Sequence, residues 1–128
     1  MWQAMIIVIG GAHQGKLAYA RQMWPGTLWA DGKVCGEEKI FHCGGIYDFQ
    51  EYIAGRMREG GDLSAFPRRL FSENPRIVIV ADEIGYGIVP AERKLREYRE
   101  TTGRVLTELA AMSAQVHRVV CGIGTRIK

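Results

Sequence analysis

A short apolar run that passes into a glycine-rich turn and then into a helical pattern constrains this chain most: AMIIVIGGAHQGKLAYA, residues 4–20. Residues 5–9 are apolar and mostly β-branched with no polar alternation, which predicts a strand buried on both faces of a parallel sheet. Gly10, Gly11 and Gly15 let the backbone turn tightly, so that several N–H groups can face one anion at the start of a helix. The segment therefore predicts a strand, a phosphate-binding loop and a first helix.

The spacing of Gly10, Gly15 and Lys16 matches the first seven positions of the phosphate-loop pattern, in which the lysine adds a positive charge. At the eighth position, where a Ser or Thr hydroxyl normally helps to hold Mg²⁺, this chain has Leu17. Phosphate binding is therefore better supported than catalysis, and the alternative is an ordinary glycine turn. We interpret His13 as a solvent-facing loop residue rather than a base. The candidate nucleotide-binding residues are Gly10, Gly11, Ala12, His13, Gln14, Gly15, Lys16 and Leu17.

A second strongly apolar strand pattern, RIVIVADE at residues 76–83, ends in two acids. In phosphate-loop enzymes an Asp at the end of such a strand holds magnesium, directly or through water. Asp82 and Glu83, together with Lys16, are therefore the candidate catalytic residues, and Asp82 is the candidate metal ligand. The alternative is that the strand simply ends in polar residues, which would still place them at the sheet edge where ligands bind.

Length and composition limit the classes of protein that this chain can represent. Its 128 residues predict a single domain, residues 1–128, and 47% apolar with 24% charged residues is typical of a globular protein. The net charge of +3 is mild and the basic residues are scattered, which favours a phosphate-bearing ligand over nucleic acid. No apolar run is long enough to span a bilayer and no signal peptide is recognisable, so we expect a cytoplasmic protein.

Three cysteines occur, Cys35, Cys43 and Cys121, without a CxxC pair. An odd number in this arrangement argues against a disulfide framework, and we expect reduced thiols, with Cys121 in a strand. A metal site formed by Cys35, Cys43 and His42 is an alternative, although their spacing differs from the usual zinc patterns.

The rest of the chain alternates between strand and helix patterns, which predicts a three-layer α/β fold with a small, mainly parallel sheet and helices on both faces. We expect Gly44 and Gly45 to end a short edge strand, and Asp48 to lie near the N-terminus of a helix, where the helix dipole favours an acid. The expected segments are a helix at 16–23, strands at 27–30 and 39–43, helices at 47–59, 64–74 and 91–114, and a strand at 116–121. The longest helix has a predicted core stripe of Leu95, Tyr98, Val105, Leu109 and Met112, with Gly103 marking close packing or a kink.

Residues 81–105, ADEIGYGIVPAERKLREYRETTGRV, together with the GGAHQGK loop and the closing GIGTRIK, resemble the bifunctional adenosylcobinamide kinase / adenosylcobinamide-phosphate guanylyltransferase family of cobalamin biosynthesis. The resemblance implies a recombinase-like phosphate-loop NTPase fold and a homo-oligomer, expected to be a trimer. It also implies two activities: phosphorylation of adenosylcobinamide by a nucleoside triphosphate, and guanylyl transfer from GTP through a histidine.

The resemblance also assigns residues by their match to the family motifs. Residues 10–16 match its phosphate loop. The other matching positions are Glu83, Gly85, Gly87 and Pro90 in the GIVP block and Arg93, Arg99, Gly103 and Arg104 in the long helix.

The chain departs from the family pattern in its middle, because it is markedly shorter between Trp29 and Ile77. In the family this region holds the helix with the guanylated histidine and a further core strand with an acidic end. By position His42 falls after that helix, so the guanylyl acceptor is unknown and His42 is disfavoured. Leu17 and Leu106 replace polar residues of the family, whereas Asp82 replaces a usual Asn.

These observations predict a nucleotide-binding protein that uses ATP or GTP, with Mg²⁺ in question because of Leu17, to phosphorylate adenosylcobinamide or a related corrinoid. Guanylyl transfer is less favoured than phosphoryl transfer. One alternative is a catalytically impaired nucleotide-binding, regulatory or assembly partner in corrinoid metabolism. Another is a small phosphate-loop kinase with a different substrate.

Overall fold

The computed structural model describes residues 4–83 and 92–128. The predicted turn and family block at Gly85, Gly87 and Pro90 lie outside these residues. The elements in chain order are β1 (Ile6–Gly10), α1 (Lys16–Met23), β2 (Trp29–Asp31), the 3-10 helix η1 (Lys39–Phe41), β3 (Gly45–Tyr47), α2 (Phe49–Arg58), α3 (Phe66–Glu73), β4 (Val78–Asp82), α4 (Arg93–Met112), β5 (Gln115–Val120) and β6 (Ile123–Arg126).

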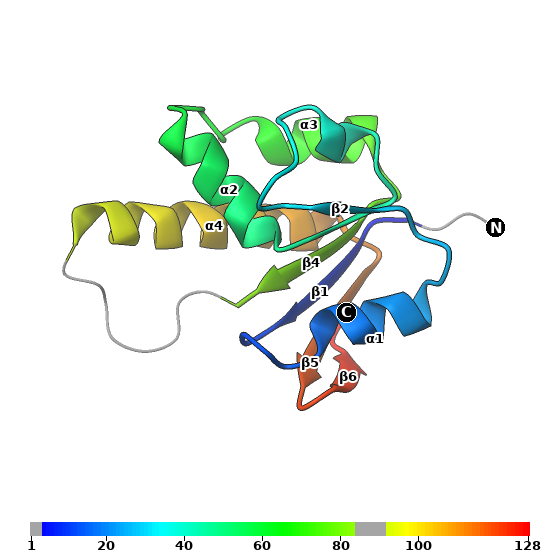
Figure 1. The fold of residues 1–128 in the computed structure, drawn as a ribbon. Helices are drawn as coiled ribbons and strands as arrows, with labels where there is room; N and C mark the ends of the chain where they lie inside the picture. Colours follow the sequence, from blue (N-terminus) through cyan, green and yellow to red (C-terminus); the bar gives the residue numbers. More distant parts are fainter. Residues whose placement is uncertain (1–3, 84–91) are drawn as a thin grey trace.

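Within the described residues the strands form one sheet in the order β2-β3-β4-β1-β5-β6. Every neighbouring pair is parallel except β5 and β6, which are antiparallel. Helix α1 covers one face of the sheet, and α2, α3 and α4 cover the other (Figure 1). This arrangement confirms the predicted α/β fold with three layers and a mainly parallel sheet.

The central strands β1 and β4 are apolar on both faces, as their sequence predicts. Ile7 and Ile79 are register partners that point into the larger core beneath α2, α3 and α4. Val8 and Val80, also partners, point into the smaller core beneath α1. Burying each of these side chains contributes about 1.5–3 kcal/mol to folding, so the two strands form a rigid base for the residues at their ends.

The predicted edge strand at residues 39–43 is wrong. Residues 39–41 form η1, because Ile40 and Phe41 are both buried, which a half-buried strand with alternating sides does not allow. The strand instead begins at Gly45, a residue that we expected to break it. A Cβ at Gly45 would lie 2.7 Å from the Trp29 ring, so glycine is required where β3 passes β2.

The end of the chain also differs from the prediction. The closing residues form β6, and Cys121 lies in the turn before it rather than in a strand. Cys121 and Gly122 both have positive φ, 51° and 76°, as a two-residue hairpin turn requires. The structure thus adds an antiparallel edge strand to the predicted sheet.

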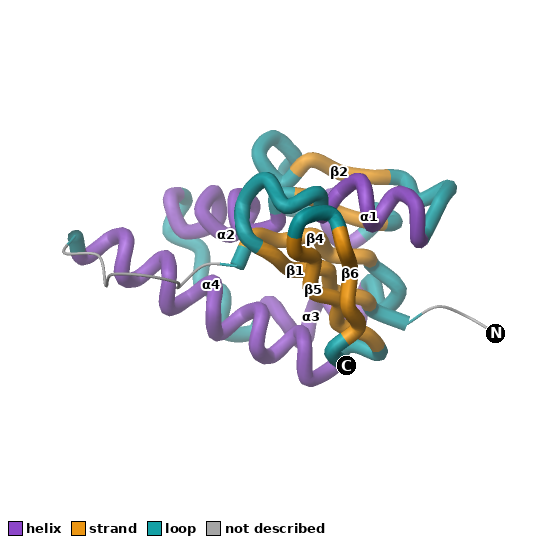
Figure 2. The backbone as a smooth tube through the Cα atoms, turned by 90° about the horizontal axis from the view of Figure 1, so that it is seen from below, coloured by secondary structure: helices purple, strands orange, loops and turns teal. Residues whose placement is uncertain are grey.

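The predicted core stripe of α4 is correct only in part. Val105 and Leu109 are fully buried, but Leu95 is 50% exposed. The N-terminal half of α4 extends beyond the strands in both views, so the first turn has no sheet to pack against (Figures 1 and 2). Gly103 does not mark close packing, since a Cβ there would meet open space.

No helix within residues 4–83 and 92–128 is both long and apolar enough to cross a membrane.

Candidate functional site

The carboxyl ends of β1, β3 and β4 meet at one edge of the sheet. β1 and β4 are neighbours, and Gly10 and Asp82 are partners at the ends of these strands. The chain leaves β1 into α1 on one face, and after β4 it returns to β5 through α4 on the other face. Adjacent strands whose helices lie on opposite faces open a crevice where ligands bind in open α/β sheets.

The loop between β1 and α1 carries a buried lysine into this crevice. Gly15, with φ of +84°, caps α1 in the left-handed region, and Lys16 is the first helical residue. Lys16 Nζ lies 2.6 Å from Asp82 Oδ1 and donates to the carbonyl of Gly11 at 2.7 Å. Because the Lys16 side chain is only 8% exposed, water screens this ion pair less than it screens a surface pair. The geometry brings together the lysine and the acid that the sequence singles out separately.

A hairpin from the other end of the chain supports the loop. The backbone N–H of Cys121 donates to Gln14 Oε1 at 2.6 Å, and that of Gly122 donates to the Gln14 carbonyl at 2.8 Å. A Cβ at Gly10 would lie 2.5 Å from the carbonyl oxygen of Val119 in β5, so the start of the loop must be glycine. No local pattern signals the contact between Gln14 and Cys121, because it joins residues more than a hundred positions apart.

Glu83 is held on the other side of β1, away from Asp82. Its carboxylate receives two bonds from Arg118, at 3.1 Å and 3.3 Å, and its N–H donates to the Gly10 carbonyl at 2.8 Å. The Glu83 side chain is 14% exposed. These contacts join the ends of β4, β1 and β5, so Glu83 stabilises the base of the loop.

The opposite wall of the crevice begins where β3 ends. Asp48, with φ of 51°, follows β3 directly and precedes α2. Gln50 accepts a bond from the Asp82 N–H at 2.9 Å, and its amide donates to Asp48 Oδ1 at 3.4 Å. The Tyr98 hydroxyl donates to the Gln50 carbonyl at 3.0 Å, and burial raises the pKa of Tyr98 to about 12, so it stays a donor at neutral pH.

We expected the core strand with an acidic end to be missing from the middle of this chain. The structure corrects that expectation: β3 is a parallel strand between β2 and β4, and Asp48 follows it. The sequence pattern hides this, because a three-residue strand gives no clear alternation and Asp48 reads as a helix cap.

Between the two walls lies a cavity of about 500 Å³. Most of the predicted loop residues line it, as does Asp82, whereas Glu83 and His42 do not. Leu17 is part of its wall. The lining residues are Ala12, His13, Gln14, Gly15, Lys16, Leu17, Ala18, Lys33, Tyr47, Asp48, Gln50, Glu51, Val80 and Asp82. Sequence reasoning missed Lys33 and Gln50, and it read Asp48 only as a helix-terminal acid.

Two carboxylates that line this cavity could supply some of the oxygen ligands of a hard cation. Asp48 and Asp82 supply carboxylate oxygens, the ligands that Mg²⁺ prefers, and Mg²⁺ is commonly held by one or two carboxylates together with phosphates of the substrate. Across the described ranges, 4–83 and 92–128, no group of three potential side-chain ligands is close enough to hold a metal by itself. The residues therefore fit a magnesium ion that arrives with a nucleotide.

The cysteine cluster is a poorer alternative site. Burial raises the pKa of Cys43 to about 11 and also raises that of Cys35. Within residues 4–83 and 92–128, Cys35, Cys43 and His42 do not form a group of three ligands that could hold a metal ion. All three cysteines are free.

A glycine loop with a buried lysine, placed between the first strand and first helix of a parallel sheet, defines a phosphate-loop NTPase fold. A family model for "cobinamide kinase / cobinamide phosphate guanyltransferase" matches residues 56–127, which is more than half of the chain. The chain belongs to this family.

Two relatives carry the printed name "bifunctional adenosylcobalamin biosynthesis protein CobU", one from Escherichia coli K12 and one from Salmonella typhimurium LT2. Each is 47% identical to this chain over 53 residues, 41% of this chain and 29% of the relative. The aligned region thus spans less than a third of the relatives' own length. The family is one of enzymes in cobalamin biosynthesis.

Proposed function

We propose that this protein binds a nucleoside triphosphate in the cavity between the loop and β3 and transfers a phosphoryl group to adenosylcobinamide or a related corrinoid. The observation that carries the proposal is the Lys16–Asp82 pair, 2.6 Å apart at the crevice between β1 and β4. In phosphoryl transfer a lysine contacts the phosphate and an acid holds the metal or the accepting hydroxyl, and the close approach of these two groups supports that assignment.

In the proposed mechanism, residues of this chain bind the phosphates and hold the site in place. On nucleotide binding Lys16 exchanges Asp82 for a phosphate oxygen, and the loop N–H groups surround the same group, which stabilises the charge that develops during transfer. The acceptor hydroxyl forms the new P–O bond as the bond between that phosphorus and the leaving nucleoside diphosphate breaks, and the released proton passes to solvent. Glu83 acts by positioning, since it ties the end of β4 to β1 and β5.

Either ATP or GTP is proposed as the donor, with Mg²⁺. Asp82 and Asp48 would hold the ion, and Leu17 supplies none of the hydroxyl oxygen normally present at its position. When bound, Mg²⁺ would neutralise charge on the phosphates.

Guanylyl transfer is proposed to be the weaker activity. His42 is exposed at the end of η1 and does not line the cavity, and His117 is buried against Tyr19. His13 lies in the phosphate loop itself, where the sequence gives it no base role. A histidine nucleophile needs both a nearby phosphate site and an orienting partner. No acceptor is assigned for this step.

The test is mass spectrometry of adenosylcobinamide after incubation with the purified protein, ATP, GTP and Mg²⁺, with Lys16→Ala as the control. We expect a phosphate to be added by the wild type and not by the variant. An added guanylyl group would overturn the ranking of the two activities. Unchanged adenosylcobinamide, with native circular dichroism and a cooperative unfolding transition, would overturn the kinase assignment.

A second candidate is a catalytically impaired nucleotide-binding or assembly partner, and Leu17 in the cavity wall favours it. Calorimetric titration separates the two: a partner protein would bind nucleotide through Lys16 yet transfer nothing. The trimeric assembly and the cytoplasmic location stay predictions.

A further inference from the structure

Residues 32–38, which we call the strap, connect β2 to η1 and begin at the wall of the cavity. At its first residue, Gly32, the N–H donates to the Tyr47 carbonyl at 2.9 Å. A Cβ at Gly32 would collide with the Asp48 carbonyl oxygen, so only glycine permits this approach. The start of the strap is therefore fixed against the junction of β3 and α2.

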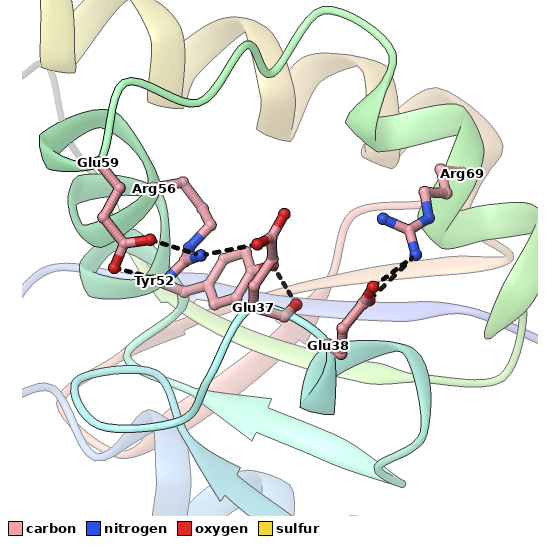
Figure 3. A network of polar contacts seen from close by, with 6 residues as sticks. All are labelled: Glu37, Glu38, Tyr52, Arg56, Glu59 and Arg69. Atoms are coloured by element: carbon pink, nitrogen blue, oxygen red, sulfur yellow. Dashed lines mark hydrogen bonds and ion pairs between the residues drawn. The ribbon is translucent and has the colours of Figure 1, made fainter.

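The far end of the strap is held by α2 and α3, as Figure 3 shows. The Tyr52 hydroxyl donates to the backbone carbonyl of Glu37 at 2.8 Å, and Arg56 Nη1 lies 3.5 Å from Glu37 Oε2. Arg69 donates to both oxygens of Glu38, at 3.0 Å and 3.3 Å. The Arg56 side chain is 13% exposed but that of Glu37 is 63% exposed, so this ion pair contributes at most about 1 kcal/mol, as surface pairs do.

Between these anchors the strap presents Lys33 to the cavity. The Lys33 N–H donates to Asp31 Oδ1 at 2.9 Å, which fixes the backbone, while Nζ lies 3.6 Å from Asp48 Oδ2. Its side chain is 60% exposed and lines the same cavity as Lys16, from the opposite wall. A lysine exposed to solvent needs no special role, but this one follows the fixed Gly32 directly and lines a cavity whose other wall is a phosphate loop.

The positive charge of Lys33 favours an anion in the cavity. Without a metal ion beside it, Asp48 would repel a phosphoryl group in the cavity, and the positive charge of Lys33, 3.6 Å away, offsets that repulsion. We propose that Lys33 contacts a phosphoryl group bound in this cavity, and that the strap, anchored by Tyr52, Arg56 and Arg69, positions it. The inference rests on the proposed nucleotide binding. The group is the terminal phosphate of the nucleotide or a phosphate already carried by the acceptor.

The first experiment measures the affinities of GTP, GDP and phosphorylated cobinamide by calorimetric titration at fixed ionic strength. Lys33→Met should weaken GTP binding about fivefold to tenfold, as expected for loss of one charged hydrogen bond in a partly wet site. Lys33→Arg should stay within about twofold of wild type, because it keeps the charge. Lys39→Met is the matched control, an exposed lysine that does not line the cavity, and should change nothing.

The pattern of losses identifies the source of the phosphate. A loss for GTP larger than for GDP assigns the contact to the terminal phosphate, and a loss only for phosphorylated cobinamide assigns it to the acceptor. Unchanged affinity for all three ligands would overturn the proposal while leaving nucleotide binding intact. A wild type that binds no nucleotide would remove the proposed function as well.

The second experiment tests the strap through Tyr52→Phe, which removes the bond to Glu37 and keeps the ring. Alone it should weaken the affected ligand about twofold to threefold, whereas in a Lys33→Met background it should cost nothing more, since residues that act through one another are not additive. Its effect on the free energy of unfolding should be equal in both backgrounds. Additive losses in affinity would show that Tyr52 does not act through Lys33 and would overturn the positioning role.

Discussion

The part of the chain that matches the family model and the part before it contribute differently to the cavity. Residues 56–127 supply β4, β5 and β6, with α3 and the long α4. Residues 4–55 supply the glycine loop, β2, β3 and the strap. Among the described residues that line the cavity, Val80 and Asp82 alone come from the matched part.

Among the described residues, the family match therefore covers mainly the scaffold, while most of the proposed site lies outside it. Each wall nevertheless relies on the matched part. The β5–β6 hairpin supports the loop through Gln14, and Asp82 reaches both walls, through Lys16 on one side and Gln50 on the other. Substitutions at matched positions on the two walls can show which wall contributes more to nucleotide binding and phosphoryl transfer.

The largest expected effect comes from the two acids. Asp82→Asn should lower the rate of phosphoryl transfer at least about 100-fold, and Asp48→Asn should do so to a similar extent, because each removes a charged oxygen beside the phosphates. In the absence of Mg²⁺, Asp82→Asn should bind nucleotide a few-fold more tightly, since it frees Lys16 from its ion pair. Quenched-flow rates and nucleotide titrations check both.

Asp48→Asn is the matched control for the tighter nucleotide binding expected of Asp82→Asn, because Asp48 pairs with Lys33 and not with Lys16. If both substitutions tightened nucleotide binding equally in the absence of Mg²⁺, the gain would reflect net charge alone. The specific exchange of Lys16 from Asp82 to phosphate would then be wrong.

The next effect concerns stability on the loop side. Gly10→Ala should lower the free energy of unfolding by about 3 kcal/mol, because its Cβ would lie 2.5 Å from a backbone oxygen in a rigid sheet. Gly11→Ala is the control in the same loop, since its nearest contact is an ordinary 3.6 Å. Urea unfolding measures both, and equal losses would contradict the close packing of the loop on β5.

The same comparison applies to the strap. Gly32→Ala should be costly for the same reason, whereas Gly36→Ala meets open space. We expect Gly32→Ala to impair the opposite wall with less loss of global stability than Gly10→Ala, because the strap is a surface segment and β1 is central. For an equal loss in the free energy of unfolding, Gly32→Ala should lower nucleotide affinity more than Gly10→Ala does. A larger loss of affinity for Gly10→Ala would indicate that the nucleotide is bound by the loop side of the cavity alone.

The sequence predicted the parts of the fold that local pattern controls. Apolar runs at β1 and β4 and the glycine–lysine spacing identified the layers, the loop and Asp82. The sequence pattern failed where contacts between distant residues determine the structure. Gly45 is a strand residue because it passes the Trp29 ring, and the role of Gln14 depends on a hairpin at the end of the chain. Lys33 carried no signal, because its position at the cavity depends on the tertiary fold around β3 and not on a local pattern.

A smaller effect is expected at Leu17. Leu17→Ser would restore the hydroxyl that normally helps to hold Mg²⁺, and the side chain already lies in the cavity wall. We expect phosphoryl transfer to rise about tenfold at limiting Mg²⁺, which corresponds to about 1.4 kcal/mol. Leu17→Ala serves as the control for lost volume. Equal rates for both variants would show that Mg²⁺ is held by the two acids and the phosphates alone.

The smallest effect concerns the contact that joins the two parts of the chain on the α1 face. Tyr19 OH lies 2.7 Å from His117 Nδ1, and His117 Nε2 lies 2.8 Å from Gln115 Oε1, so the neutral ring donates to Gln115 and accepts from Tyr19. Burial, and to a lesser degree Arg126, lowers the pKa of His117 below its ordinary value of 6.5. The folded state therefore resists a proton that the unfolded chain accepts.

The stabilisation from this neutral ring is fully present above pH 6.5 and is lost as the pH falls from there toward the lowered pKa. Between about pH 8 and pH 5 the wild type should lose more stability than His117→Gln, while carboxylate titrations affect both equally and cancel in the difference. His42→Gln, at an exposed position, should follow the wild type. If His117→Gln lost as much stability as the wild type when the pH falls, the Tyr19–His117 contact would tolerate a charged ring. Acid would then not weaken the attachment of α1 and its loop to β5.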